Sequence, residues 1–192
     1  MSPRPEVLLR PLELTDWPAV HSWSGPPETC RYQAWGPDSP AEAEAFVRGA
    51  VDAWSDLPLL RESYAALVDG EVLGMGVLEV GPRARHRQGE ISYAVHPRVW
   101  RKGVGTAIGG ALLRIGFAER GQHRIAATCD PRNTGSAALL RRLGMTYEGR
   151  LRHTMLLRDG WRDSETFGIL EDEWRGTPRT AARADTAQRV FL

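Results

Sequence analysis

Two glycines between a predicted strand and a predicted helix constrain this 192-residue chain more than any other feature. Residues 90–96 alternate apolar and polar positions as a strand does, and residues 107–119 repeat apolar positions at helical spacing. Gly103 and Gly105 lie between these segments and open the helix. A helix N-terminus offers free N–H groups and a positive dipole end, and glycine leaves the backbone accessible. Residues 99–106 are therefore predicted to bind phosphate.

Two basic residues, Arg101 and Lys102, precede the first glycine and would help to neutralise a pyrophosphate. A P-loop is excluded, because no lysine followed by Ser or Thr comes directly after Gly105. Gly103, Gly105 and Gly109 do form a loosened dinucleotide-binding pattern. That interpretation stays open at this point, as does a helix start that binds no ligand.

The bulk properties predict one ordinary globular domain at residues 1–176, followed by a C-terminal tail at 177–192. The chain is 42% hydrophobic and 26% charged, and its net charge of +1 gives no global attraction to nucleic acid or membrane. It contains no apolar run of membrane-spanning length and no apolar signal-peptide core, which predicts a cytoplasmic protein. Cys30 and Cys129 lack metal-ligand spacing and are predicted to be reduced, buried thiols.

Strand and helix patterns alternate in the order of an α+β protein. The predicted strands are residues 7–10, 64–68, 72–80, 90–96, 124–129, 146–153 and 164–170. The predicted helices are residues 15–23, 40–54, 107–119 and 133–143. A capping box of Ser39 and Glu42 begins the second helix, and Asp69-Gly70 is a strong hairpin signal.

Four motifs follow one another along residues 6–175. They are Leu-Arg-Pro-Leu at 9–12, Trp-Arg-Lys-Gly-Val-Gly-Thr at 100–106, Asn133 and Ser136 followed by Leu-Gly-Met at 143–145, and Asp163 through Glu173-Trp174. Together they resemble the GNAT superfamily of N-acetyltransferases, and within it the branch of the ribosomal-protein N-terminal acetyltransferases. The resemblance implies the GNAT fold: a mostly antiparallel mixed sheet of about seven strands, splayed between the two middle strands and flanked by about four helices.

The resemblance also implies acetyl-CoA as the acetyl donor, with no metal. The backbone amides that would hold its pyrophosphate are those of Arg101, Lys102, Gly103, Val104, Gly105 and Thr106. Backbone groups around Ala94, Val95 and His96 would position the pantetheine and polarise the thioester carbonyl, where a donor stabilises developing negative charge. Asn133 would contact the pantetheine arm.

Acetyl transfer requires a neutral amine, because an ammonium has no lone pair with which to attack, so some group must take the proton. Glu90 is the predicted base, since it begins the strand before the loop and shares a strand face with Ser92, Ala94 and His96. An α-amine needs far less help than a lysine, so a water-relayed base would suffice for an N-terminal substrate.

The group that reprotonates the leaving thiolate is less defined. Many GNAT enzymes use a helix tyrosine, but Leu140 occupies that position here. Ser136 and Tyr147 are the candidate acids, and His96 and His153 are alternatives.

The resulting hypothesis is an N-acetyltransferase in which an amine attacks acetyl-CoA directly within a ternary complex. The acceptor is a protein N-terminus or a small-molecule amine. Loops at 25–40, 81–88 and 156–163 would shape its cleft; their characteristic residues are Trp35, Arg85, Arg87 and Trp161. By analogy, the last strands would form a homodimer. The alternative from another class is a non-catalytic acyl-CoA-binding sensor of the same fold.

Overall fold

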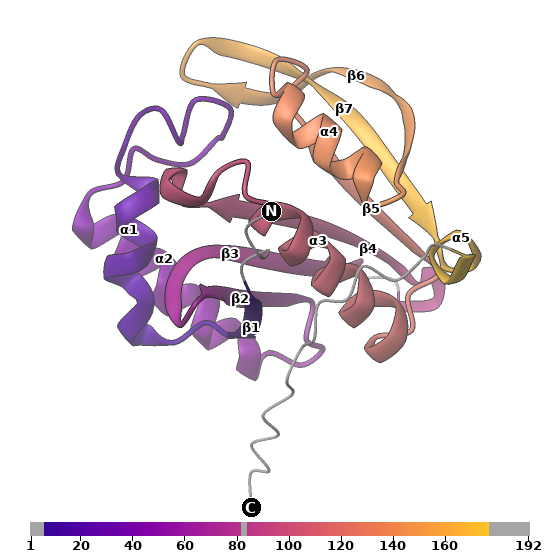
Figure 1. Cartoon of the computed structure of the whole chain (residues 1–192), viewed down its shortest axis with the longest axis horizontal. Helices are drawn as coiled ribbons and strands as arrows, with labels where there is room; N and C mark the ends of the chain where they lie inside the picture. Colours follow the sequence, from indigo (N-terminus) through magenta and orange to yellow (C-terminus); the bar gives the residue numbers. More distant parts are fainter. Residues whose placement is uncertain (1–5, 82–83, 177–192) are drawn as a thin grey trace, which may run out of the picture.

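A seven-stranded sheet flanked by helices dominates the computed structural model, which describes residues 6–81 and 84–176 (Figure 1). The strand order is β1-β2-β3-β4-β5-β7-β6. The strands are β1 (Val7–Pro11), β2 (Arg61–Val68), β3 (Glu71–Val80), β4 (Gln88–Val95), β5 (Arg124–Cys129), β6 (Thr146–Leu157) and β7 (Gly160–Leu170). The α-helices within these ranges are α1 (Trp17–Ser24), α2 (Pro40–Asp52), α3 (Val104–Arg114), α4 (Thr134–Arg142) and α5 (Glu171–Gly176). The predicted tail, residues 177–192, lies outside the described residues.

The two middle strands, β4 and β5, form the one parallel pair of this sheet among the described residues, and they separate after a short contact. Three residue pairs join them, from Gln88 with Arg124 to Glu90 with Ala126. Beyond Glu90, β4 pairs only with β3, and β5 pairs only with β7. Figure 1 shows β5, β7, β6 and α4 diverging from the strands before them. The predicted α+β sheet and its splay are confirmed.

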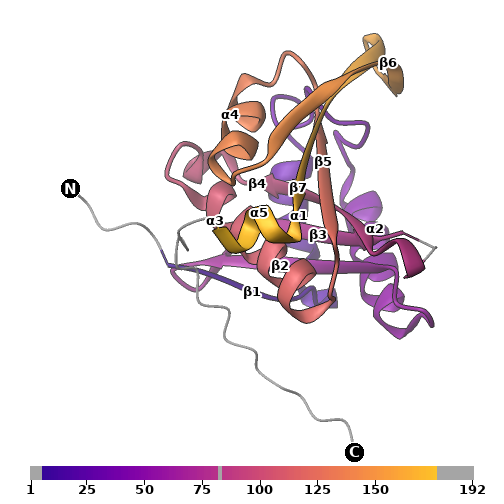
Figure 2. The ribbon, with the colours of Figure 1, turned by 90° about the vertical axis from the view of Figure 1, so that its right-hand side faces the viewer.

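Helices cover both faces of the sheet and enclose two hydrophobic cores. The core on the α3 and α4 side includes the fully buried Leu78, Ile108 and Leu140. The core beneath α1 and α2 includes Val47 and Ala65. Figure 2 views the sheet from the side, with α3 and α4 on one side and α2 on the other. A ligand in the splay would therefore reach both helical layers.

Glycines in β3 let α3 and β4 approach closely. A Cβ at Gly76 would lie 2.8 Å from the Ile108 Cγ2 atom of α3. A Cβ at Gly74 would lie 2.8 Å from the carbonyl oxygen of Ala94 on β4. A larger residue would displace the β4 backbone at Gly74 and the side chains of α3 at Gly76.

The last two strands are longer than predicted, because β6 extends to Leu157 and β7 begins at Gly160. Most β6 side chains are exposed, and its pairing with β7 shifts register at bulges. Gly149 and His153 both adopt positive φ there. A strand exposed on both faces has no period-two apolar pattern, so its length could not be read from the sequence.

The predicted helix starts differ in their outcome. Ser39 and Glu42 form the predicted capping box, in which each side chain accepts a backbone N–H of the other residue. Asp16 stands at the N-cap of α1, but its side chain makes no capping bond there and instead accepts from Arg10 and from the Glu13 backbone N–H. No helix in the described ranges is both long and apolar enough to span a membrane. The free thiols of Cys30 and Cys129 are buried, as predicted.

Candidate active site

The N-terminus of α3 is open to a ligand. Gly103 caps this helix with φ of +86°, a left-handed conformation that favours glycine. The first backbone bond of the helix runs from the Ala107 N–H to the Gly103 carbonyl oxygen, at 3.0 Å. The N–H groups of Val104, Gly105 and Thr106 precede it and have no acceptor within the helix. These three donors and the positive end of the helix dipole would form the anion cradle that the sequence predicts.

The second glycine of the loop has a packing role. A Cβ at Gly105 would lie 2.6 Å from Leu139 Cδ1, and one at Gly109 would lie 2.5 Å from Leu143 Cδ1. Leu139 lies in α4 and Leu143 is its C-cap residue, so both contacts join α3 to α4. Gly105 therefore lets two helices pack closely, whereas the sequence interpretation assigned its missing side chain to ligand access.

Two cationic side chains accompany the cradle. Arg101 and Lys102 are exposed, and neither has an ion-pair partner in the described part of the chain. Arg101 holds a positive φ of 61°. Both charges are therefore available to an anionic ligand at the start of α3.

At the splay, some backbone groups of β4 make hydrogen bonds within the chain and others do not. The His96 N–H donates to the Leu73 carbonyl oxygen at 2.9 Å, so alternation directs the backbone groups of Ala94 toward β3 as well. The groups of Tyr93 and Val95 consequently face the splay. The indole Nε1 of Trp100 donates to the Val95 carbonyl oxygen at 2.7 Å. The Val95 N–H remains directed into the gap, as does the Tyr93 backbone.

A cavity of about 160 Å³ lies on the opposite, α1–α2 side of the sheet. Its apolar lining consists of Val20, Trp23, Trp35, Phe46, Met75 and Val77. Its more polar lining consists of Ser24, Gln33, Asp38, Arg61 and Ser92, with Tyr93 and Ala94 beside them on β4. The cavity thus reaches β4 at the residues that border the splay.

Glu90 lies where β4 and β5 begin to separate, on the same strand face as Ser92 and Ala94. Its carboxyl is partly desolvated by the surrounding protein, and this raises its pKa above the ordinary value. The carboxylate of Glu79, directly opposite on β3, raises the pKa further, while a hydrogen bond with Thr128 lowers it. A carboxylate with an elevated pKa at this position is a suitable proton acceptor.

On the other face of β4, a hydroxyl pair bridges the splay. The Tyr93 hydroxyl lies 2.9 Å from Ser136 Oγ on α4. Burial raises the pKa of Tyr93 to about 12 and that of the Cys129 thiol, on β5, to about 11. Ser136 is also held by the α4 N-cap, because its N–H donates to Asn133 Oδ1 at 3.0 Å. The predicted residues Ser136 and Asn133 therefore lie together beside the gap.

The remaining candidate acids lie elsewhere. Tyr147 is on β6, separated from the splay by β7 and β5, with its ring against Phe167. His153 stacks on Trp161 in the β6–β7 hairpin. His96 follows β4, where desolvation and the nearby Arg98 lower its pKa. The structure does not bring Tyr147 or His153 together with Glu90.

The connection between α1 and α2, residues 25–39 (the α1–α2 loop), is tied to the β6–β7 hairpin (Figure 1). Arg158 in the hairpin donates to the carbonyl oxygens of Trp35, at 2.9 Å, and Cys30, at 3.4 Å. Arg132 pairs with Asp159 of the same hairpin at 2.6 Å. The two Arg158 bonds hold the α1–α2 loop against the hairpin, and the Arg132 pair holds the turn between β5 and α4 against it.

Of the four residues predicted to characterise the acceptor cleft, Trp35 lines the cavity. Trp161 is 60% exposed and does not line it. Arg87 pairs with Glu171, and Arg85 is exposed. The structure also describes only part of the 81–88 loop, because residues 82 and 83 lie outside the described ranges.

Sequence reasoning missed several residues around the splay. Tyr93 could have been found from strand alternation, which places its side chain on the face opposite Glu90. Asp38 and Arg61 come from separate segments and carry no local motif, so only the tertiary structure identifies them as neighbours of the cavity.

An open helix N-terminus and a cavity that meet at a divided sheet define an enzyme that brings two substrates together across that sheet. The chain belongs to the GNAT acetyltransferases, because the family model described as "Acetyltransferase (GNAT) domain" matches residues 6–146. It is therefore an N-acetyltransferase with the GNAT fold. Within the described ranges, no group of three or more His, Cys, Asp or Glu residues is arranged to hold a metal ion.

Individual relatives span nearly the whole chain. An uncharacterized N-acetyltransferase, YnaD of Bacillus subtilis, is 28% identical over 169 residues, covering 88% of this chain and 95% of the relative. The spermidine N(1)-acetyltransferase of Escherichia coli is 26% identical over 177 residues, covering 91% of each. The solved structure of Mycobacterium smegmatis RimJ in complex with CoA-disulfide has a TM-score of 0.76 at 22% identity, covering 88% of this chain and 86% of that one. The last likeness shows the fold alone.

Proposed function

We propose that this N-acetyltransferase transfers the acetyl group of acetyl-CoA to a primary amine by direct attack in a ternary complex. The amine is a protein N-terminal α-amine or that of a small molecule. The observation that carries the proposal is the splay, because it connects the open N-terminus of α3 with the cavity on the α1–α2 side. Acetyl-CoA supplies an activated acetyl group as a thioester.

The donor half relies on backbone groups. The N–H groups at the start of α3, with Arg101 and Lys102, would bind the pyrophosphate. The free N–H of Val95 would donate to the thioester oxygen and stabilise the negative charge that develops there. Of the three backbone groups proposed from the sequence, those of Ala94 and His96 face β3, so Val95 takes this role.

Glu90 would accept the proton of the attacking amine, directly or through a water. Of the two candidate acids, Ser136 borders the splay and Tyr147 does not, so we assign proton donation to the leaving thiolate to Ser136. The Tyr93 hydroxyl would orient Ser136 and replace its proton. Asn133 would act chiefly by fixing the start of α4.

A homodimer remains part of this proposal. The edge strand β6 carries twelve residues that are mostly exposed, and its free edge could pair with a second copy.

Thiol release from acetyl-CoA, measured with N-terminal peptides and small amines, tests the proposed function. We expect release that depends on the acceptor, and stabilisation against heat unfolding by acetyl-CoA but not by NAD(P). Substituting both Arg101 and Lys102 by Ala should weaken acetyl-CoA binding most at low salt. Tight binding of acetyl-CoA without release to any amine would instead indicate the acyl-CoA sensor.

A further inference from the structure

The walls of the cavity are largely apolar and aromatic. Trp23 comes from α1, Trp35 from the α1–α2 loop and Phe46 from α2, while Met75 and Val77 of β3 form part of the sheet side. Such walls stabilise an apolar or aromatic group by removing its surface from water, and tryptophan rings also attract a cation. The volume of about 160 Å³ lies below the usual range for drug-sized ligands. It therefore suits a group no larger than a small side chain or arylalkyl amine.

One carboxylate stands out in this lining. Asp38 belongs to the α1–α2 loop, where its backbone N–H donates to the Ser24 carbonyl oxygen and its carbonyl oxygen accepts from His21. Its side chain has no hydrogen-bond or ion-pair partner among the described residues. The charge is thus unmatched, although the backbone that carries it is fixed. A ligand ammonium would supply the missing partner.

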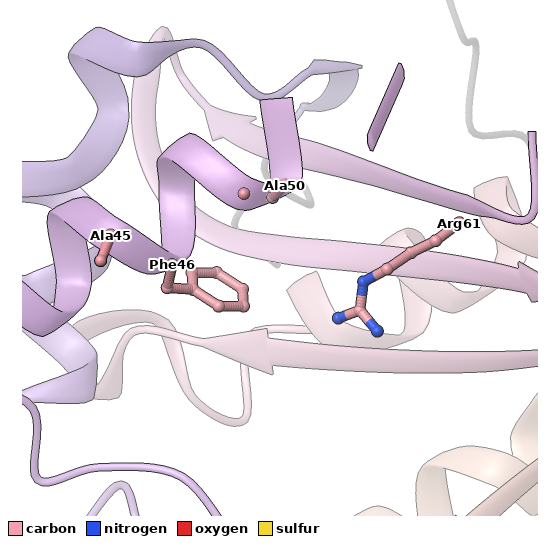
Figure 3. Close-up of a pocket in the computed structure, with 5 residues that line it drawn as sticks. Ala45, Phe46, Ala50 and Arg61 are labelled. Atoms are coloured by element: carbon pink, nitrogen blue, oxygen red, sulfur yellow. The ribbon is translucent and has the colours of Figure 1, made fainter. Parts of the chain in front are cut away.

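The opposite charge lies at the outer end of the cavity. Arg61 of β2 and Phe46 line both the cavity and an adjoining hollow of about 310 Å³ along α2. Figure 3 shows their side chains beside Ala45 and Ala50 of that helix. Arg61 is paired with Glu79. Because Arg61 lines both hollows, a ligand that extended beyond the cavity toward α2 would contact this ion pair.

We infer that the acceptor is a small amine with an apolar, preferably aromatic body and a single positive charge, held through Asp38, and that polyamines are poor substrates. This rests on the proposed function, whose acceptor class it narrows. The apolar walls match the body of such an amine, and Asp38 matches the ammonium form in which it arrives. This ammonium then loses one proton, through water to Glu90, and the neutral amine that results attacks the thioester. A second ammonium on an extended chain would lie near the Arg61–Glu79 ion pair, whose carboxylate already has a partner, and the lining of the cavity holds no further carboxylate to receive it.

The test compares 2-phenylethylamine with spermidine as acceptors by kcat/KM. For the wild type we expect a preference of about tenfold or more for 2-phenylethylamine. Asp38→Asn should lower kcat/KM for this amine about ten- to hundredfold, the range of a lost charged hydrogen bond. Asp56→Asn removes the same charge from an exposed residue outside the cavity and should have no effect. Arg61→Gln should improve the use of spermidine relative to 2-phenylethylamine.

Calorimetric titration of 2-phenylethylamine into the CoA-saturated protein separates this inference from the proposed function. Binding that Asp38→Asn weakens and Asp56→Asn does not would support the inference even if no amine were acetylated, an outcome that would reject only the proposed function. Acceptor-dependent thiol release with a preference for spermidine would overturn the inference and leave the proposed function intact. Equal effects of the two Asp→Asn substitutions would also overturn it. Asp38→Asn should fold normally, because its carboxylate makes no intramolecular bond.

Discussion

At the scale of single residues, the position of Glu90 in the sheet determines the pKa of its carboxyl. Its carboxyl stands where β4 leaves β5, and Glu79 faces it across β3 and β4. Desolvation and this like charge both raise its pKa. The ionised form is therefore lost at a higher pH than for an ordinary glutamate, which improves proton acceptance near neutral pH but narrows the range in which the base is available.

The pH dependence of acetyl transfer follows from this shift. The wild-type rate should fall as the pH drops through the raised pKa of Glu90, because the protonated carboxyl cannot accept a proton. Glu90→Gln should remove this fall of the rate at low pH, the acidic limb of the profile. It should also lower kcat about hundredfold for an acceptor whose ammonium has a high pKa, without changing the affinity for acetyl-CoA. Measurement of kcat against pH with a single acceptor checks the expectation.

Glu79→Gln is the matched variant for this measurement. It removes the neighbouring charge and retains the base, so the pKa of Glu90 should decrease and the acidic limb should move to lower pH. An acidic limb that persists unchanged in Glu90→Gln would exclude this residue as the base.

At the scale of elements, the α1–α2 loop depends on Gly36. This residue has φ of +59°. A Cβ there would overlap Cys30 Sγ and lie 2.5 Å from the Ser24 carbonyl oxygen. The loop also carries Trp35 and Asp38, so its backbone conformation determines the shape and charge of the cavity.

Gly36→Ala should therefore destabilise the protein by about 2–4 kcal/mol, from left-handed strain and overpacking. It should also raise KM for the amine more than KM for acetyl-CoA. Gly49→Ala is the control, because nothing lies within 4 Å of its added methyl in α2, and it should stabilise by about 0.5–1 kcal/mol. Urea unfolding and steady-state kinetics measure both effects; equal stabilities of the two variants would contradict the assignment.

The secondary-structure elements differ in how well the sequence predicts them. The Ser39 capping box, the Asp69-Gly70 hairpin and the start of α3 at Gly103 depend on neighbours in the chain, and their structures were correctly predicted. The cofactor side of the site is built from such local signals. The acceptor side is not, since Asp38 and Arg61 meet only through tertiary packing, and the exposed strand β6 lacks the apolar alternation that would reveal its length.

At the scale of the whole molecule, an ion pair between a buried carboxylate and an exposed guanidinium links the sheet to the end of the α3 region. Glu62 on β2 is 1% exposed and accepts two hydrogen bonds from Arg120, at 2.6 and 2.8 Å. The Tyr64 hydroxyl donates to the same carboxylate. Arg120 directly follows the π-helical extension of α3, Ile115–Glu119. The contact therefore fixes the helix that carries the phosphate cradle relative to the strands.

Glu62→Gln should lower the free energy of unfolding by about 2 kcal/mol, because the buried side chain would no longer accept charge-assisted hydrogen bonds from Arg120 as a carboxylate. Tyr64→Phe removes one hydrogen bond and should cost about 1 kcal/mol. Equilibrium unfolding in urea distinguishes the two values. A smaller loss for Glu62→Gln than for Tyr64→Phe would show that the ion pair contributes little to stability.

The splay between β4 and β5 has a consequence for how such an enzyme can diversify. In the proposed mode of binding, the donor side is recognised mainly by main-chain N–H groups, which no side-chain substitution removes directly. The acceptor side would be recognised by side chains from α1, α2, their connecting loop and the sheet, each of which a single codon change can replace. New acceptor preferences would then arise by substitution on one side of the divided sheet without altering the backbone groups that bind the donor on the other.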